Sequence, residues 1–243
     1  SKATHISAFI GHTVLLSNKG NVYTFGGGIA GGHNDDFSNH GLPRVVSSLD
    51  KIIQVAAGDD FTVLLRKDGS VFTFGKGESG QLGRTGEEYQ LTPRKIESFT
   101  KKNIKIKQIA AGEKHTVLLS KDNQVYTLGS NAYGQLGHGN RRNQNTPKVV
   151  TSLYDKKIVQ ISAGLHHTVF LGADGSVYTA GRGNFGQLGQ GQTLIDQPYP
   201  QKISFLGNVK IVQASAGFRH TVLVAQDGSV YTFGLGVACG HND

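Results

Sequence analysis

A repeated unit constrains the fold of this chain more than any other feature of its sequence. A His-Thr pair, or Phe-Thr in the second copy, recurs at spacings of 49, 54, 52 and 53 residues, with its threonine at Thr13, Thr62, Thr116, Thr168 and Thr221. A glycine that closes a V-Y-T-F-G-like segment keeps the same spacings, at Gly26, Gly75, Gly129, Gly181 and Gly234. Two markers that stay in step establish the repeat, and a period of about 50 residues is typical of propellers and solenoids.

Each copy contains short β-branched and aromatic runs separated by turn residues, a pattern that predicts hairpins. In the third copy, residues 117–119 and 125–128 are such runs, and Asp122-Asn123 lies between them. Most copies have Gly at the second turn position, as a turn with positive φ requires, and Asn tolerates the same conformation. We expect one strand before each Ala-Gly pair and a fourth strand after each proline, as at residues 94–96. Four strands per repeat fit a propeller blade better than a solenoid turn.

The sequence therefore predicts one all-β domain, a β-propeller over residues 1–243 with about five visible four-stranded blades. The expected repeats span about 1–50, 51–104, 105–156, 157–209 and 210–243. The first copy lacks the Ala-Gly pair and the last stops inside its final motif, so five hairpins accompany four proline-led strands. We interpret this mismatch as a sign that the segment belongs to a longer chain and a larger ring.

The composition limits which classes of partner and which cellular compartment we expect. The net charge of +8 favours acidic partners, but the basic residues are scattered and no recognition helix accompanies them, which argues against nucleic acid. The single cysteine, Cys239, precludes an internal disulfide and favours the cytoplasm or the nucleus. No apolar run reaches the ~18 residues that a membrane span needs.

Two motifs that resemble ligand-binding sites recur with the repeat, so we interpret them as structural. G-x-G-x-x-G at residues 75–80 and 181–186 is followed by Gln-Leu-Gly rather than by a helix, so no dinucleotide or other cofactor is predicted. The histidines lack metal-ligand spacing, so no metal site is predicted, and the Gly-His-Asn-Asp runs at 32–35 and 240–243 are expected to be turns. No catalytic nucleophile–base set stands apart from the repeats, which argues against a conventional enzyme.

A histidine begins the same strand in four copies, at His12, His115, His167 and His220, and Phe61 replaces it in the second. We interpret these histidines as structural hydrogen-bond donors or acceptors between neighbouring blades, since buried polar groups need partners. A partner-facing role for His115, His167 and His220 stays open as the alternative.

The pair of residues before each His-Thr varies between copies, which is where function is expected. Structural positions of a repeat stay fixed, whereas turn residues on a shared face are free to diversify. The candidate partner-binding residues are Asp59, Asp60, Glu113, Lys114, Leu165, His166, Phe218 and Arg219. The alternative is that they are ordinary solvent-exposed turn residues.

The motifs A-G-x-x-H-T-V-x-L at 163–171, D-G-x-V-Y-x-x-G at 174–181 and G-Q-L-G at 186–189 resemble the repeat of the regulator of chromosome condensation family. The resemblance covers essentially the whole chain. It implies a ring that usually has seven blades, and a family with nucleotide-exchange factors for the small GTPase Ran, ubiquitin ligases, a plant ultraviolet-B photoreceptor and bacterial effectors. It also implies that Asp59, Asp60 and the turn at 165–167 face a GTPase.

Two functions follow from this resemblance. The first is a protein-interaction propeller that binds a Ran-type small GTPase, either docking it or promoting guanine-nucleotide exchange. No repeat spacing exceeds 54 residues, which leaves no room for the β-wedge of the exchange factor, and Trp, on which plant-type light sensing depends, is absent. The alternative is a substrate- or partner-recognition propeller of a larger protein such as a ubiquitin ligase. The expected location is cytoplasmic or nuclear, including the host cytosol for a secreted bacterial effector.

Overall fold

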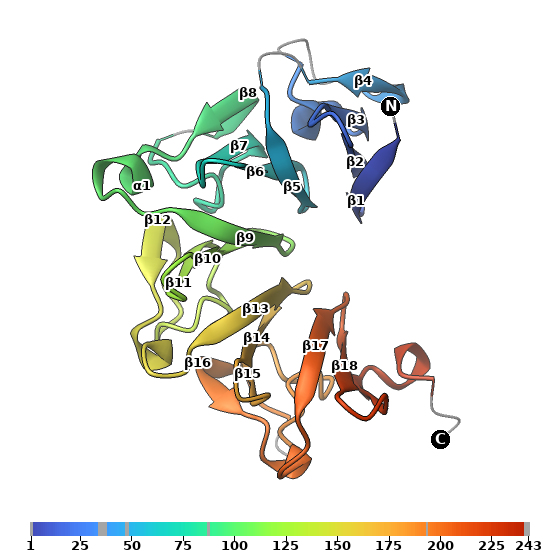
Figure 1. Ribbon diagram of the computed structural model, residues 1–243, viewed down its shortest axis with the longest axis vertical. Coiled ribbons are helices and arrows are strands. Elements are labelled where there is room, and N and C mark those ends of the chain that lie inside the picture. Colours follow the sequence, from blue (N-terminus) through green and yellow to red (C-terminus); the bar gives the residue numbers. More distant parts are fainter. Residues whose placement is uncertain (1, 34–37, 47–48, 87, 193, 241–243) are drawn as a thin grey trace.

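The structure, a computed structural model, describes residues 2–33, 38–46, 49–86, 88–192 and 194–240. Within these ranges the chain forms five antiparallel sheets, each built from strands consecutive in sequence and placed beside the next along an arc (Figure 1). The first strand of each sheet lies on the inner side of the arc (Figure 1). The all-β propeller of repeated blades that the sequence predicts is therefore confirmed.

Four of the sheets have four strands and the fifth has three. The first two sheets comprise β1 (Ala3–Phe9), β2 (His12–Ser17), β3 (Val22–Gly26) and β4 (His40–Val45), then β5 (Ile52–Ala57), β6 (Phe61–Arg66), β7 (Val71–Lys76) and β8 (Tyr89–Lys95). The next two comprise β9 (Ile106–Ala111), β10 (His115–Ser120), β11 (Val125–Gly129) and β12 (Gln144–Val149), then β13 (Ile158–Ala163), β14 (His167–Gly172), β15 (Val177–Gly181) and β16 (Gln197–Lys202). The fifth comprises β17 (Ile211–Ala216), β18 (His220–Ala225) and β19 (Val230–Gly234).

Short helical turns connect some of the strands. They are η1 (Gly28–Gly31), α1 (Glu97–Lys101), η2 (Thr151–Leu153), η3 (Ser204–Leu206) and η4 (Gly236–Ala238). The hairpin turn between the second and third strand of each sheet has the expected positive φ, for example 85° at Gly69 and 62° at Asn123. Asparagine thus replaces glycine in the third sheet without a change of turn.

The outer strands differ from the sequence expectation in one respect. They contain their prolines instead of following them: Pro93 lies inside β8, Pro147 inside β12, and Pro198 and Pro200 inside β16. Proline cannot donate to a strand ladder, and an outer strand has one edge that needs no donor. The expectation that these strands begin after the proline was therefore wrong.

Apolar side chains fill the spaces between neighbouring sheets. Each of four core clusters draws residues from two adjacent sheets; one joins Phe61 and Leu65 of the second sheet to Ile109 and Leu118 of the third. Burial of one such side chain contributes about 1.5–3 kcal/mol. Stability therefore depends on nearest-neighbour contact between blades, as in other repeat proteins.

Glutamine side chains add a polar link between the inner strands. Gln108 on β9 donates from Nε2 to the carbonyl of Ile161 on β13 at 3.2 Å, and its Oε1 accepts from the Ile161 amide at 3.1 Å. Gln54 and Gln160 make the same paired bonds to Ile109 and Ala214 of the next sheet. The inner strands β5, β9 and β13 are thereby fixed in register against the strand that follows each of them.

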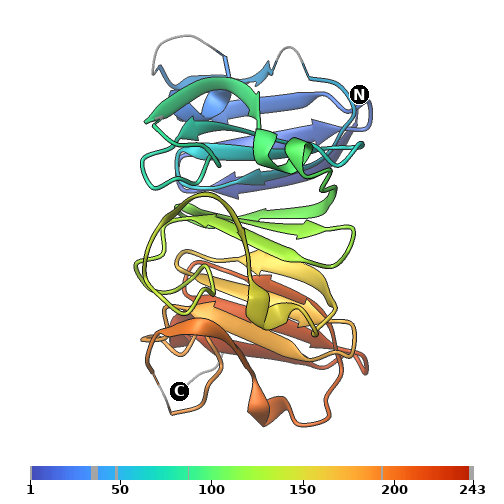
Figure 2. The ribbon, with the colours of Figure 1, turned by 90° about the vertical axis from the view of Figure 1, so that its left-hand side faces the viewer.

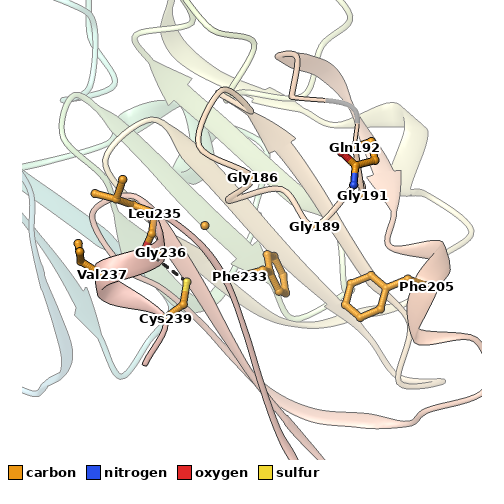
Figure 3. Close-up of a pocket in the computed structure, with 11 residues that line it drawn as sticks. Gly186, Gly189, Gly191, Gln192, Phe205, Phe233, Leu235, Gly236, Val237 and Cys239 are labelled. Carbon is orange, nitrogen blue, oxygen red and sulfur yellow. Dashed lines mark hydrogen bonds between the residues drawn. The ribbon is translucent and has the colours of Figure 1, made fainter. Parts of the chain in front are cut away.

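The fifth sheet leaves its outermost strand, β19, without a neighbour on one side among the described residues. A hollow of about 830 Å³ lies there, lined by Phe205, Phe233 and a run of glycines that includes Gly186 (Figure 3). In the second and third repeats the corresponding glycines pack against the outer strand of the next sheet, as Gly134 does against Pro198 of β16. The hollow therefore lies where an outer strand covers the glycines of the neighbouring repeats.

Candidate protein-binding face

The turns between the first and second strands of the sheets lie at one end of the strands, and the opposite ends carry the hairpin turns (Figure 2). We call the end formed by residues 58–60, 112–114, 164–166 and 217–219 the turn face. Backbone hydrogen bonds join its turns from blade to blade. The Asp59 amide donates to the Glu113 carbonyl (2.9 Å), the Glu113 amide to Leu165 (3.2 Å), and the Leu165 amide to Phe218 (3.3 Å). The candidate residues thus lie along one continuous hydrogen-bonded rim.

Buried histidines directly after these turns connect one blade to the next. Nε2 of His115 lies 3.1 Å from Oγ1 of Thr168 in the next blade, and Nε2 of His167 lies 3.0 Å from Oγ1 of Thr221. His12 makes the equivalent contact with Thr62 at 3.0 Å. The inter-blade hydrogen bond expected from the repeated histidine is therefore present in three blades.

The threonine determines which histidine tautomer is present. The Thr168 hydroxyl donates its single proton to the Gln135 carbonyl at 2.7 Å, so Nε2 of His115 must be the donor to Thr168. His115 and His167 are completely buried, and burial lowers the pKa of each to about 3. Both imidazoles are therefore neutral at physiological pH and act as fixed hydrogen-bond donors.

The second and fifth blades differ at this position. Phe61 is fully buried in the second blade, where Thr116 of the following blade keeps only its hydroxyl bond to the Gln81 carbonyl among the described residues. His220 begins β18 in the fifth blade and is half-buried. The repeat thus tolerates loss of the histidine hydrogen bond when an aromatic ring still fills the space.

Three acidic side chains lie together on the turn face, and we call Asp59, Asp60 and Glu113 the acidic turns. All three are half-buried. Burial raises the pKa of Asp59, and the neighbouring carboxylates of Asp60 and Glu113 raise it further. Asp60 has a φ of 57°, a conformation that Asp and Asn adopt more readily than other non-glycine residues.

Glu113 connects the acidic turns to the next blade. Nδ1 of His166 lies 2.9 Å from one Glu113 carboxylate oxygen, and Nζ of Lys114 lies 3.8 Å from the other. The pKa of His166 is lowered to about 4, first by burial and then by the positive charges of Arg182, Arg219 and Lys114. His166 is therefore neutral at physiological pH, and its Nδ1 lies beside the Glu113 carboxylate.

Leu165 and Phe218 occupy the same position in successive turns but lie in opposite environments. Leu165 is 6% exposed and Phe218 is 47% exposed. The Leu165 side chain is therefore buried, and Phe218 exposes an apolar surface to solvent. The sequence predicts both residues to bind a partner, and the pattern of the repeats does not show that one is buried and the other exposed.

A cluster of arginine and aromatic side chains lies beside His166. The Tyr133 ring stacks on the His166 ring with centroids 4.6 Å apart. The Arg182 guanidinium carbon lies 4.8 Å from the Tyr133 centroid and 5.3 Å from that of Phe185. The Arg219 guanidinium carbon lies 4.6 Å from the Phe185 centroid and 5.4 Å from that of Phe218. These cation–π contacts hold both guanidinium groups in place on the turn face.

Sequence reasoning missed Tyr133, Arg182 and Phe185. They lie between the closing glycine of the third strand and the Gly-Gln-Leu-Gly motif, where the copies also differ from one another. The same criterion of variable positions within a fixed repeat, applied to this second loop, finds them. The loops that carry Tyr133, Arg182 and Phe185 thus contribute side chains to the turn face.

The described part of the chain places charged and aromatic side chains on the turn face. It contains no group of three or more His, Cys, Asp or Glu side chains placed to hold a metal ion. The Gly-His-Asn-Asp runs at 32–35 and 240–243 lie partly outside the described residues. No described helix is long and apolar enough to cross a membrane.

Comparison with known proteins identifies the family. A family model described as the RCC1-like domain matches residues 1–243. The chain belongs to the RCC1-like domain family. It is 37% identical over 228 residues to the ultraviolet-B receptor UVR8 of Arabidopsis thaliana, covering 92% of this chain and 51% of the receptor. The probable E3 ubiquitin-protein ligase HERC4 of Homo sapiens is 39% identical over 239 residues, covering 95% of this chain and 22% of the ligase.

Solved structures agree with this assignment. Yeast RCC1 (Prp20), solved with Kap60, superposes with a TM-score of 0.84 at 29% identity, covering 97% of this chain and 56% of the other. A structure of Prp20p from Saccharomyces cerevisiae gives a TM-score of 0.85 at 28% identity, covering 97% and 58%. The chain therefore spans little more than half the length of these structures and of the plant receptor.

Proposed function

We propose that this chain is a protein-interaction propeller whose turn face binds a small GTPase of the Ran type. The related Prp20p has binding properties toward Gsp1p and histones. UVR8 and HERC4 are further relatives of this chain. The observation that carries the proposal is the acidic turns. They present three carboxylates from two neighbouring blades on the hydrogen-bonded rim, in the loops that the family resemblance assigns to GTPase contact.

The rim favours binding because its side chains are positioned before a partner arrives. Backbone bonds between turns and the buried histidines beneath them reduce the conformational entropy lost on association. Nucleotide exchange needs one further property, tighter binding to the nucleotide-free GTPase than to the loaded form. Each tenfold preference for the nucleotide-free state corresponds to about 1.4 kcal/mol of coupling free energy.

The decisive experiment compares two double variants of equal charge change. Asp59→Asn with Asp60→Asn removes the carboxylates while keeping side chains that tolerate the positive φ of residue 60. Asp122→Asn with Asp155→Asn makes the same change at exposed positions at the opposite ends of the strands. Binding is measured by biolayer interferometry against a panel of small GTPases that includes Ran, each with GDP, with a GTP analogue and without nucleotide.

We expect the first pair to weaken GTPase binding by about tenfold or more, and the control pair to leave it within about twofold. Release of a fluorescent GDP analogue from the bound GTPase then separates exchange from docking. Absence of binding to every GTPase by the unaltered protein would refute the proposal. Equal losses in both variants would show that net charge, and not the acidic turns, controls association.

A second candidate is partner recognition within a larger protein such as a ubiquitin ligase. The match to HERC4 favours it, since 95% of this chain aligns at 39% identity with 22% of the ligase. This function would use the same turn face for a different partner. It gains support if a non-GTPase protein binds the unaltered chain, loses affinity for the Asp59→Asn, Asp60→Asn variant, and becomes ubiquitinated in cells that contain the full-length protein.

A further inference from the structure

The turn face carries a second charged region, of sign opposite to the acidic turns. We call Arg182, Arg219, Phe185, Phe218 and Tyr133 the arginine shelf. Its aromatic rings come from the third, fourth and fifth blades, and its two guanidinium groups both contact the Phe185 ring. Both arginines are half-buried, so their donors are partly withdrawn from water and still reachable from solvent.

The arginine shelf lacks the acidic partners that two clustered guanidinium groups would normally have. No ion pair joins Arg182 or Arg219 to a carboxylate in the described part of the chain. The adjacent acid, Glu113, lies 2.9 Å from Nδ1 of His166 and 3.8 Å from Nζ of Lys114. Nε of Arg219 is buried without a hydrogen-bond partner among the described residues. Two like charges therefore contact one aromatic ring without neutralisation, an arrangement that an incoming anion would stabilise.

The geometry of guanidinium selects the kind of anion. A planar fork of N–H donors matches the two oxygens of a carboxylate, and stacking on aromatic rings fixes the plane of each fork before binding. The rings around the forks, above all the exposed Phe218, would pack against the apolar stems of acidic side chains. This surface fits a protein segment that presents glutamate or aspartate side chains beside apolar atoms.

We propose that the arginine shelf binds paired carboxylates of an acidic segment in the partner protein, one carboxylate for each guanidinium group. The inference rests on the proposed function, because it places the partner on the turn face. It adds that the partner must present an acidic region to the fourth and fifth blades and a basic region to the acidic turns of the second and third. Opposite charges at the two regions fix the orientation of the partner on the rim.

The test uses a fluorescein-labelled peptide of alternating glutamate and glycine, with a glutamine–glycine peptide as the neutral control probe. Fluorescence anisotropy at low salt measures binding to the full chain and to three double variants. Arg182→Gln with Arg219→Gln removes both charges, and Arg182→Lys with Arg219→Lys keeps the charges but removes the forks. Lys67→Gln with Lys121→Gln removes two exposed charges in hairpin turns at the opposite ends of the strands. Thermal melts verify that each variant is folded.

We expect the arginine-to-glutamine variant to lose at least about tenfold in affinity for the glutamate peptide. The lysine control should stay within about twofold of the unaltered chain. The arginine-to-lysine variant should also lose affinity, because lysine lacks the bidentate fork. If the arginine-to-glutamine and lysine-control variants lose the same affinity, or if the glutamine peptide binds as well, the arginine shelf is not a carboxylate site.

Binding of Ran loaded with GDP, measured with the same variants, separates this inference from the proposed function. If Ran does not bind but the glutamate peptide does so through the two arginines, the GTPase proposal fails and the arginine shelf stands. If Ran binds and the arginine-to-glutamine variant binds both Ran and the peptide normally, the GTPase proposal stands and the arginine shelf is refuted.

Discussion

Replacement of the buried imidazole at His167 tests how the rim is supported. The ring is fully buried beneath the turn face, and its Nε2 lies 3.0 Å from Thr221 of the next blade. His167→Ala removes this hydrogen bond and leaves a cavity where the ring was. Loss of a buried hydrogen bond costs about 1 kcal/mol, and truncation of a buried large side chain costs about 2–5 kcal/mol.

We expect His167→Ala to lower the free energy of unfolding by about 3 kcal/mol, and the melting temperature by about 6–12 °C for a chain of this size. The second blade supplies the matched variant, because Phe61 occupies the same site without the bond. His167→Phe keeps a ring in the space, so it should cost about 1 kcal/mol. The exposed His5→Ala serves as the control and should stay within about 0.5 kcal/mol.

The assay is urea unfolding followed by circular dichroism, run beside GTPase binding at pH 7.5. If His167→Ala retains full stability but no longer binds the GTPase, the histidine is a contact residue and the division between support and surface is wrong. A double-mutant cycle of His167→Phe with Thr221→Val should give a coupling energy of about 1 kcal/mol if the Nε2–hydroxyl bond is as strong as its geometry indicates.

Three further predictions concern stability. Burial lowers the pKa of His12 to about 4 and those of His115 and His167 to about 3, so the folded state binds fewer protons than the unfolded state between those values and 6.5. The free energy of unfolding should therefore be greatest above pH 6.5 and lower by about 2 kcal/mol per histidine at pH 5. His167→Phe should show a shallower dependence of this free energy on pH. Urea titrations at pH 5 and at a pH above 6.5 measure the difference. Gln108→Leu removes two inter-blade hydrogen bonds and should cost about 2 kcal/mol, with faster hydrogen exchange in β13. Gly164→Ala places a Cβ against the Gly217 carbonyl and the His167 ring, so it should lower the melting temperature more than an alanine in an exposed turn.

Local chemistry explains why so much of the architecture could be predicted. The turn residues and the short apolar strands recur at every copy, and each hairpin closes within about 15 residues, so its pairing needs little information from the rest of the chain. The repeated histidine could likewise be assigned to a hydrogen bond between blades, since a polar residue fixed in a repeat must satisfy the same need each time. The exact donor, Nε2, became clear only when the threonine hydroxyl was seen to use its own proton on a carbonyl.

The binding surface was less predictable because it is assembled across blades. The variable pairs located the turn face, but position alone could not show that Leu165 packs inward while Phe218 stays exposed. Nor could it show that Arg182 meets Tyr133, a residue 49 positions earlier in the sequence. Those outcomes depend on which side chains neighbouring blades bring to the same space.

The sequence by itself thus determined the blade, its turns and its family, because these follow from residues close together in each repeat and present in nearly every copy. Only the tertiary structure decided the chemistry of the turn face. Carboxylates at Asp59 and Asp60 gather at one region of the rim, and guanidinium groups at Arg182 and Arg219 gather on shared rings at another. Electrostatic and stacking interactions act over a few ångströms in space, so their partners are set by how the blades pack and not by their spacing along the chain.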